Sequence, residues 1–240
     1  MAKQKTIFVT GKIANIIFYD FRGIPCSRSM PLKVRQTKAT KASSVKFGKA
    51  SSIAKNLRWG LPSILPNARD QEMIFRFRTA IFQWLLNTDT AKSKSAVNLP
   101  YLDTVEFNDE SWLRERIRLP LDIDWKTPGK VILTIPRMDP EHHIAAPAYT
   151  QSVRWQITIT DCTLDNCMMT GNYSTAIEME YGNGFIPAQQ IELPFVLKPG
   201  NITIVAIALK YTATKKGSLQ PVEDKRWMPA GVVGSVYGKP

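Results

Sequence analysis

The sequence predicts an α+β protein, with an N-terminal β-hairpin and two helices followed by an antiparallel β-sandwich of the immunoglobulin-like or jelly-roll-like kind. Two patterns predict this fold class. Between residues 43 and 87 apolar residues recur at helical spacing, whereas from residue 97 onward they alternate with polar residues in short segments. Turns rich in Pro, Gly and Asn separate those segments, as is typical of antiparallel sandwiches. We therefore expect two domains, a basic hairpin and helical region over residues 1–96 and a β-sandwich over residues 97–240.

Residues 6–30 predict short strands joined by tight turns. Apolar runs over residues 7–9 and 13–19 are followed by a third segment that ends near Arg28. Gly11 and Gly23 stand where hairpin turns need a positive φ. Because an isolated hairpin is only marginally stable in water, this one must pack on another surface.

Two helices follow a basic connector over residues 31–42. The first begins near Ser43 or Ser44, either of which can cap it, and ends before Gly60 and Pro62. A stripe of Phe, Ala and Leu runs along one of its faces.

The second helix runs from about Asn67 to Asn87, with Asp70 in its first turn. It is apolar around most of its circumference, so we expect burial on most sides, in its own core or against another subunit. The stretch Asn87 to Ser95 predicts a linker between the two domains. The residues expected to contact another copy of the chain are Phe75, Phe77, Phe82 and Trp84.

From residue 97 onward the pattern predicts strands. The segment 202–209 is apolar on both faces, so we expect it at the centre of a sheet. Pro194 predicts an edge position for the strand over residues 191–195. Residues 110–118 predict a helical turn. The other expected strands cover residues 101–107, 131–135, 153–160 and 177–181.

The net charge of the chain is confined to its first quarter. Residues 1–60 contain thirteen Lys or Arg and a single acidic residue, Asp20, whereas the other 180 residues carry equal numbers of basic and acidic side chains. Such a concentrated positive field implies a polyanionic partner or an acidic protein surface. The alternatives are docking on a neighbouring subunit and a simply solvated face. The candidate nucleic-acid-binding residues are Lys33, Arg35, Lys38, Lys41, Lys46, Lys49, Lys55 and Arg58.

Few aromatic residues lie among these basic residues. Only Phe47 and Trp59 do, and Phe47 belongs to the apolar stripe. We therefore expect contact with the nucleic-acid backbone, DNA or RNA, by electrostatic attraction and without a stacking platform for single strands.

No motif predicts a catalytic, metal or cofactor site. The cysteines Cys26, Cys162 and Cys167 fit a reducing compartment. A zinc site would add His142 or His143, but the spacing matches no common zinc pattern. The sequence contains no Gly-x-Ser-x-Gly elbow and no phosphate-binding loop, and its carboxylates are scattered. We expect no catalytic residue, no metal, no cofactor and no small-molecule substrate.

The hairpin residues Gly11, Lys12 and Asn15 and the Arg28-x-x-Pro31 sequence carry a resemblance. Over residues 11–58 the chain resembles an uncharacterised family of small basic bacterial proteins. Its members open with a Gly-Lys-aliphatic-Gly-Asn hairpin, followed by an Arg-x-x-Pro, a basic Thr-rich helix and a β-rich domain. Ala14 departs from the usual glycine. The family has no established activity, so the resemblance implies a non-enzymatic building block and transfers no site. The matching positions are Gly11, Lys12, Asn15, Tyr19, Gly23, Arg28, Pro31, Thr37 and Phe47.

A basic arm on a neutral β-sandwich is similar in layout to many capsid subunits. We therefore expect a self-assembling, homo-oligomeric structural subunit of a virion, phage-like particle or filament, whose basic region contacts nucleic acid or acidic neighbouring subunits. The alternatives are a monomeric nucleoid-type or regulatory DNA-binding protein and an enzyme with an unrecognised site. No signal peptide or membrane-length apolar run, which needs about 18 residues, is apparent, so we expect a cytoplasmic or particle location.

Overall fold

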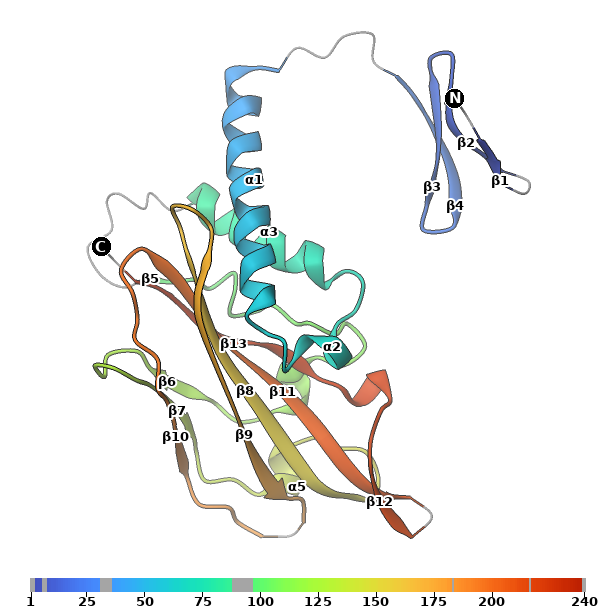
Figure 1. Cartoon of the computed structure of the whole chain (residues 1–240). Helices are drawn as coiled ribbons and strands as arrows, with labels where there is room; N and C mark the ends of the chain where they lie inside the picture. Colours follow the sequence, from blue (N-terminus) through green and yellow to red (C-terminus); the bar gives the residue numbers. More distant parts are fainter. Residues whose placement is uncertain are drawn as a thin grey trace. The chain divides into compact units, whose positions relative to one another are not determined.

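The structure, a computed structural model, is a mixed α+β protein in which β-structure predominates (Figure 1). It describes residues 3–5, 8–30, 36–87, 97–182, 184–215 and 217–238. The chain divides into two compact units, Met1–Ser44 and Val45–Pro240. The boundary predicted near residue 96 lies inside the second of these units, and the division into domains 1–96 and 97–240 stays a prediction. Among the described helices, none is both long and apolar enough to cross a membrane.

The first unit contains a four-stranded antiparallel sheet in the order β1-β2-β3-β4. Ala14, at φ 48°, forms the turn between β2 and β3, and Arg22 and Gly23, both at positive φ, form the next. Gly11 is paired with Phe18 inside β2, so it does not occupy the turn that the sequence predicted. The strands are β1 (Lys3–Lys5), β2 (Phe8–Ile13), β3 (Ile16–Phe21) and β4 (Ile24–Ser29).

Three helices follow: α1 (Lys38–Trp59), α2 (Leu65–Ala68) and α3 (Met73–Asn87). The first begins before the predicted Ser43 or Ser44, because the Thr37 hydroxyl accepts a hydrogen bond from the Thr40 amide at 3.1 Å and satisfies one of the first free N–H groups.

The second helix of the predicted pair, α3, begins at Met73 rather than at Asn67. The Asp70 carboxylate accepts hydrogen bonds from the Glu72 and Met73 amides, each at 2.7 Å, and so caps the helix. The preceding residues form the separate short helix α2, which has Pro66 in its first turn.

The main sheet is antiparallel, in the order β5-β13-β11-β8-β9, with β12 paired to one end of β11. The prediction that residues 202–209 lie at its centre is confirmed, because β11 is flanked by β13 and β8 and these residues are all buried. The strands are β5 (Val97–Asn98), β8 (Thr150–Thr163), β9 (Met169–Glu180), β11 (Asn201–Lys215), β12 (Ser218–Pro221) and β13 (Ala230–Tyr237).

Alternate side chains of β11 point to opposite faces of the main sheet and enter two different cores. Ile204 and Ala206 belong to the first core, together with Leu57 of α1 and Phe77 of α3. From Val45 onward the helices share this core with the main sheet and belong to the same unit (Figure 1).

The second core lies between the main sheet and a three-stranded antiparallel sheet in the order β10-β7-β6. Leu133 of β7 and Trp155 of β8 are fully buried there. The β10 strand is an edge strand, as the sequence predicted, but it ends directly before Pro194 instead of continuing to residue 195. The remaining elements are β6 (Asp122–Asp124), β7 (Val131–Ile135), β10 (Gln189–Leu193), α4 (Leu113–Arg116), α5 (Pro140–His143) and the 3₁₀ helix η1 (Lys225–Trp227).

Residues 101–107 form turns rather than the predicted strand, and only Glu106 bridges to Gly231 of β13. The immunoglobulin-like or jelly-roll-like sandwich stays a prediction.

Candidate nucleic-acid interface

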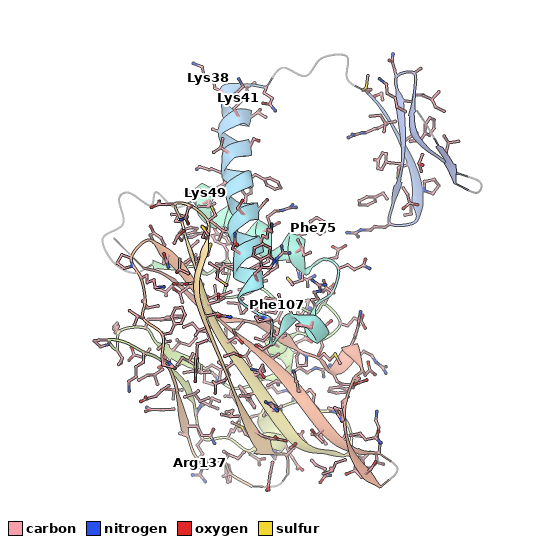
Figure 2. All side chains as sticks on the ribbon, viewed as in Figure 1. Lys38, Lys41, Lys49, Phe75, Phe107 and Arg137 are labelled. Carbon is pink, nitrogen blue, oxygen red and sulfur yellow. The ribbon has the colours of Figure 1, made fainter. Side chains whose placement is uncertain are left out.

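The basic residues predicted to bind nucleic acid fall mainly on α1. Lys33 and Arg35 lie outside the described residues, and the other six lie on the helix. At about 100° per residue, these six positions spread around more than half of the helix circumference instead of forming one stripe. Figure 2 shows Lys38, Lys41 and Lys49 at successive levels of α1.

The first half of α1 is solvated, since every residue from 36 to 48 is exposed. Burial begins at Lys49 and Ala50, where the helix meets the first core. In the described parts of the chain, none of the six basic side chains on α1 forms an ion pair with a carboxylate. Their charge is therefore free to act on a partner.

Arginine side chains gather where the end of α1 approaches α3. Arg58 is half-buried, and its Nε donates a hydrogen bond to the Ala54 carbonyl at 3.1 Å. Burial and the positive charges of Arg69 and Arg78 lower the pKa of Arg58 below its usual value. Ion pairs to these three guanidinium groups are likewise absent among the described carboxylates.

Arg78 joins these arginines to exposed aromatic rings. Its guanidinium lies 4.6 Å from the ring centroid of Phe47 on α1 and 5.2 Å from that of Phe75 on α3. Its Nε is buried and has no hydrogen-bond partner among the described residues. Phe47 also packs edge-on against Phe82, with ring centroids 5.6 Å apart. We call Arg58, Arg69, Arg78, Phe47 and Phe75 the arginine–aromatic cluster.

A second pairing of a cation with an aromatic ring lies at the end of α1. The Nζ of Lys55 is 4.5 Å from the centroid of the Trp59 ring, which is 61% exposed. Trp59 directly follows Arg58 in the sequence, so this pair adjoins the arginine–aromatic cluster.

The four residues predicted to contact another copy separate in the structure. Phe77 and Trp84 are 0% and 2% exposed and pack inside the chain, where Phe77 meets Phe107 with ring centroids 6.1 Å apart. Phe82 is partly buried against the first core. Only Phe75, at 53%, presents a well-exposed ring, so α3 uses its broad apolar surface mainly for burial within the chain.

Sequence reasoning missed the convergence of Arg69, Arg78 and Phe75 with the basic helix. It assigned Phe75 to self-association and did not select the two arginines. The alternation Phe75-Arg76-Phe77-Arg78 was the available signal, because it places cations beside apolar residues on a helix. The signal was incomplete, since only the packing of α3 beside α1 brings Arg78 onto Phe47.

The cysteines and histidines do not assemble into a metal site. Across the described residues, no group of three or more His, Cys, Asp or Glu side chains could hold a metal ion. Cys162 and Cys167 are free thiols, and burial raises the pKa of Cys162 to about 12. His142 and Asp139 interact within α5, with 2.9 Å between Nδ1 and Oδ2.

The carboxylates of Asp103 and Glu106, which line a surface hollow, serve structural roles. A hollow of about 290 Å³ is lined by Asp103, Glu106 and Arg114. The Glu106 carboxylate accepts hydrogen bonds from the Leu113 amide at 2.7 Å and from Arg114 Nε at 3.0 Å, and so holds the start of α4. Burial raises the pKa of Asp103, which accepts a hydrogen bond from the Ser235 hydroxyl.

Comparison with known proteins gives no match: no family model, curated protein or solved structure is similar to this chain. The resemblance of residues 11–58 to a bacterial family therefore stays a prediction.

Proposed function

We propose that the protein is a non-enzymatic assembly subunit of a virion, phage-like particle or filament, and that its basic region contacts nucleic acid. The observation that supports this best is the surplus of cations on α1 and beside α3 with no described carboxylate paired to them. Two of the partly or largely buried carboxylates elsewhere are paired with arginines, in the Asp70–Arg76 and Glu106–Arg114 pairs. A polyanion is the partner that such a surplus attracts.

The four-stranded sheet of the first unit supports the assembly part of the proposal. None of the described side chains from residue 9 to residue 30 is buried. A sheet that buries no apolar face gains little stability by itself, so we propose that another copy of the chain covers it. In this proposal the β-rich unit, with its immunoglobulin-like or jelly-roll-like sandwich, forms the body of the particle. The exposed apolar side chains of the sheet are Val9, Ile13, Ile16, Tyr19, Phe21 and Ile24.

Binding to random-sequence duplex DNA over a range of salt concentrations tests the nucleic-acid contact. We expect the affinity to fall steeply with salt. Changing Lys38, Lys41, Lys46 and Lys49 together to Gln should weaken binding and flatten the slope of log K against log salt by up to about one unit for each lost phosphate contact.

A matched control removes the same charge elsewhere on the chain. Lys126, Lys210, Lys215 and Lys225 are all exposed in the second unit, and changing them to Gln should leave the slope nearly unchanged. Equal effects of the two quadruple variants would place the contacts away from α1. Salt-independent binding, or no binding, would contradict the nucleic-acid contact and leave an acidic neighbouring subunit as the partner.

A further inference from the structure

We propose that the arginine–aromatic cluster is a binding site for single-stranded nucleic acid, in which the arginines hold a backbone phosphate and Phe75 stacks on an unpaired base. The inference rests on the proposed nucleic-acid contact and specifies both the place and the form of the strand. It also differs from the expectation that this region lacks a stacking platform.

The phosphate part follows from the charges of the three arginines. Arg78 reaches from α3 to the Phe47 ring of α1 at 4.6 Å, and no described carboxylate pairs with Arg58, Arg69 or Arg78. Burial lowers the pKa of Arg58, and the charges of Arg69 and Arg78 lower it further. An anion between them would relieve this repulsion. Guanidinium groups bind phosphate through paired N–H donors, and the buried Nε of Arg78 is a donor without a partner in the part of the chain that the structure describes.

The stacking part follows from the exposed rings. Arg78 covers Phe75 at 5.2 Å, yet the ring stays 53% exposed, and Trp59 beside Arg58 is 61% exposed under Lys55. Aromatic side chains interleaved with cations are the arrangement that non-specific single-strand binding uses. The bases of a duplex are already stacked and paired, so a duplex would offer this surface only its phosphates.

The expectation that the basic region has no stacking platform considered only the aromatic residues near the lysines in the sequence, and none from α3. Along α1 alone, the aromatic residues near the lysines are Phe47 and Trp59. Packing of the two helices adds Phe75 and places Arg78 between Phe47 and Phe75.

The test compares full-length variants for binding to a labelled oligothymidylate and to a duplex of the same length. Phe75→Leu keeps an apolar side chain but removes the ring, so we expect about tenfold weaker binding of the single strand and unchanged binding of the duplex. Arg69→Gln, at an exposed position, and Arg69→Gln with Arg78→Gln should weaken binding of both and lower the salt slope by about one unit per arginine.

The chain supplies a matched pair outside the cluster. The Arg137 guanidinium lies 4.3 Å from the centroid of the Phe185 ring, and Phe185 is 66% exposed. Figure 2 shows Arg137 at the opposite end of the second unit from Phe75. Phe185→Leu should leave both affinities unchanged, and Arg137→Gln should change the salt slope little. Thermal unfolding of each variant checks that loss of binding is not loss of the fold.

Three results would overturn the inference. If Phe75→Leu affects both forms equally or neither, Phe75 is not a stacking residue. If the arginine variants behave like Arg137→Gln, the phosphate lies elsewhere. Weaker DNA binding by the quadruple lysine variant would in that case still support the proposed function. If the wild-type protein binds polyglutamate but neither oligonucleotide, both proposals fail and the partner is an acidic protein.

Discussion

Gly48 inside α1 and Gly60 directly after it show how strongly the effect of one residue can depend on its surroundings. A Cβ atom added at Gly60, directly after α1, would lie 1.9 Å from the Thr160 hydroxyl and 2.6 Å from Thr160 Cβ on β8. A Cβ added at Gly48 would meet nothing within 4 Å. Gly60 therefore permits the end of α1 to lie directly on the main sheet, whereas Gly48 lies in the exposed half of the helix.

The two alanine variants should move stability in opposite directions. Gly60→Ala must displace Thr160 or the helix end, so we expect it to lower the free energy of unfolding by about 1–3 kcal/mol. Gly48→Ala should raise it by about 0.5–1 kcal/mol, because alanine loses less conformational entropy in a helix. Urea unfolding measures both, and similar shifts of the same sign would contradict the close approach.

At the scale of secondary-structure elements, prediction succeeded where the pattern is local. The segment 202–209 is apolar on both faces, and this predicted the central strand β11. The start of α1 was missed because residues 38–44 have no apolar periodicity, although Thr37 caps them. The arginine–aromatic cluster was missed because it depends on contacts between helices that the sequence keeps apart.

The start of α3 gives a prediction with a pH dependence. Partial burial favours neutral Asp70, but hydrogen bonds from Arg76 and from the Asp109 and Met73 amides outweigh it, so the pKa of Asp70 lies below its usual value. A lowered pKa means that ionised Asp70 stabilises the fold above pH 3.8 and that this stabilisation is lost as the pH falls through the folded-state pKa.

Asp70→Ala should therefore lower the free energy of unfolding by about 1–2 kcal/mol at neutral pH. The difference from the wild type should shrink at acidic pH, when the wild-type carboxylate is also protonated. Asp122→Ala, at an exposed position in β6, serves as the control and should have little effect. Chemical denaturation at several pH values measures these differences. A constant difference down to the most acidic pH would show that the carboxylate charge contributes nothing.

At the scale of the whole molecule, the proposed assembly subunit predicts that several copies of the chain associate. Light scattering of the nuclease-treated protein, with absorbance at 260 and 280 nm, measures the mass and any retained nucleic acid. We expect a large, regular species. Phe21 and Ile24 face each other across β3 and β4 and are 55% and 61% exposed, so changing both to Glu should shift the protein toward smaller species.

The control for this experiment places the same charges on the second unit. Phe185 and Leu219 are each 66% exposed, and changing both to Glu should leave the mass unchanged. If the Phe21 and Ile24 variant keeps the wild-type mass, another surface joins the copies. A wild-type monomer that still binds DNA would favour the nucleoid-type or regulatory alternative over the assembly subunit.

The exposed first half of α1 has a kinetic consequence. Lys38 lies twelve residues before Ala50, the first buried residue of the helix, and a rise of 1.5 Å per residue places it about 18 Å away along the axis. This distance exceeds twice the Debye length of about 8 Å at physiological ionic strength. Carboxylates of the second unit near the buried end of α1 therefore hardly weaken the positive field of Lys38. Arg58, half-buried at the other end, is less exposed to screening by ions. The exposed lysines at the start of α1 should govern the association rate constant of a nucleic acid, and the half-buried end of the helix its dissociation rate constant. Added salt should therefore lower the association rate constant more than it raises the dissociation rate constant.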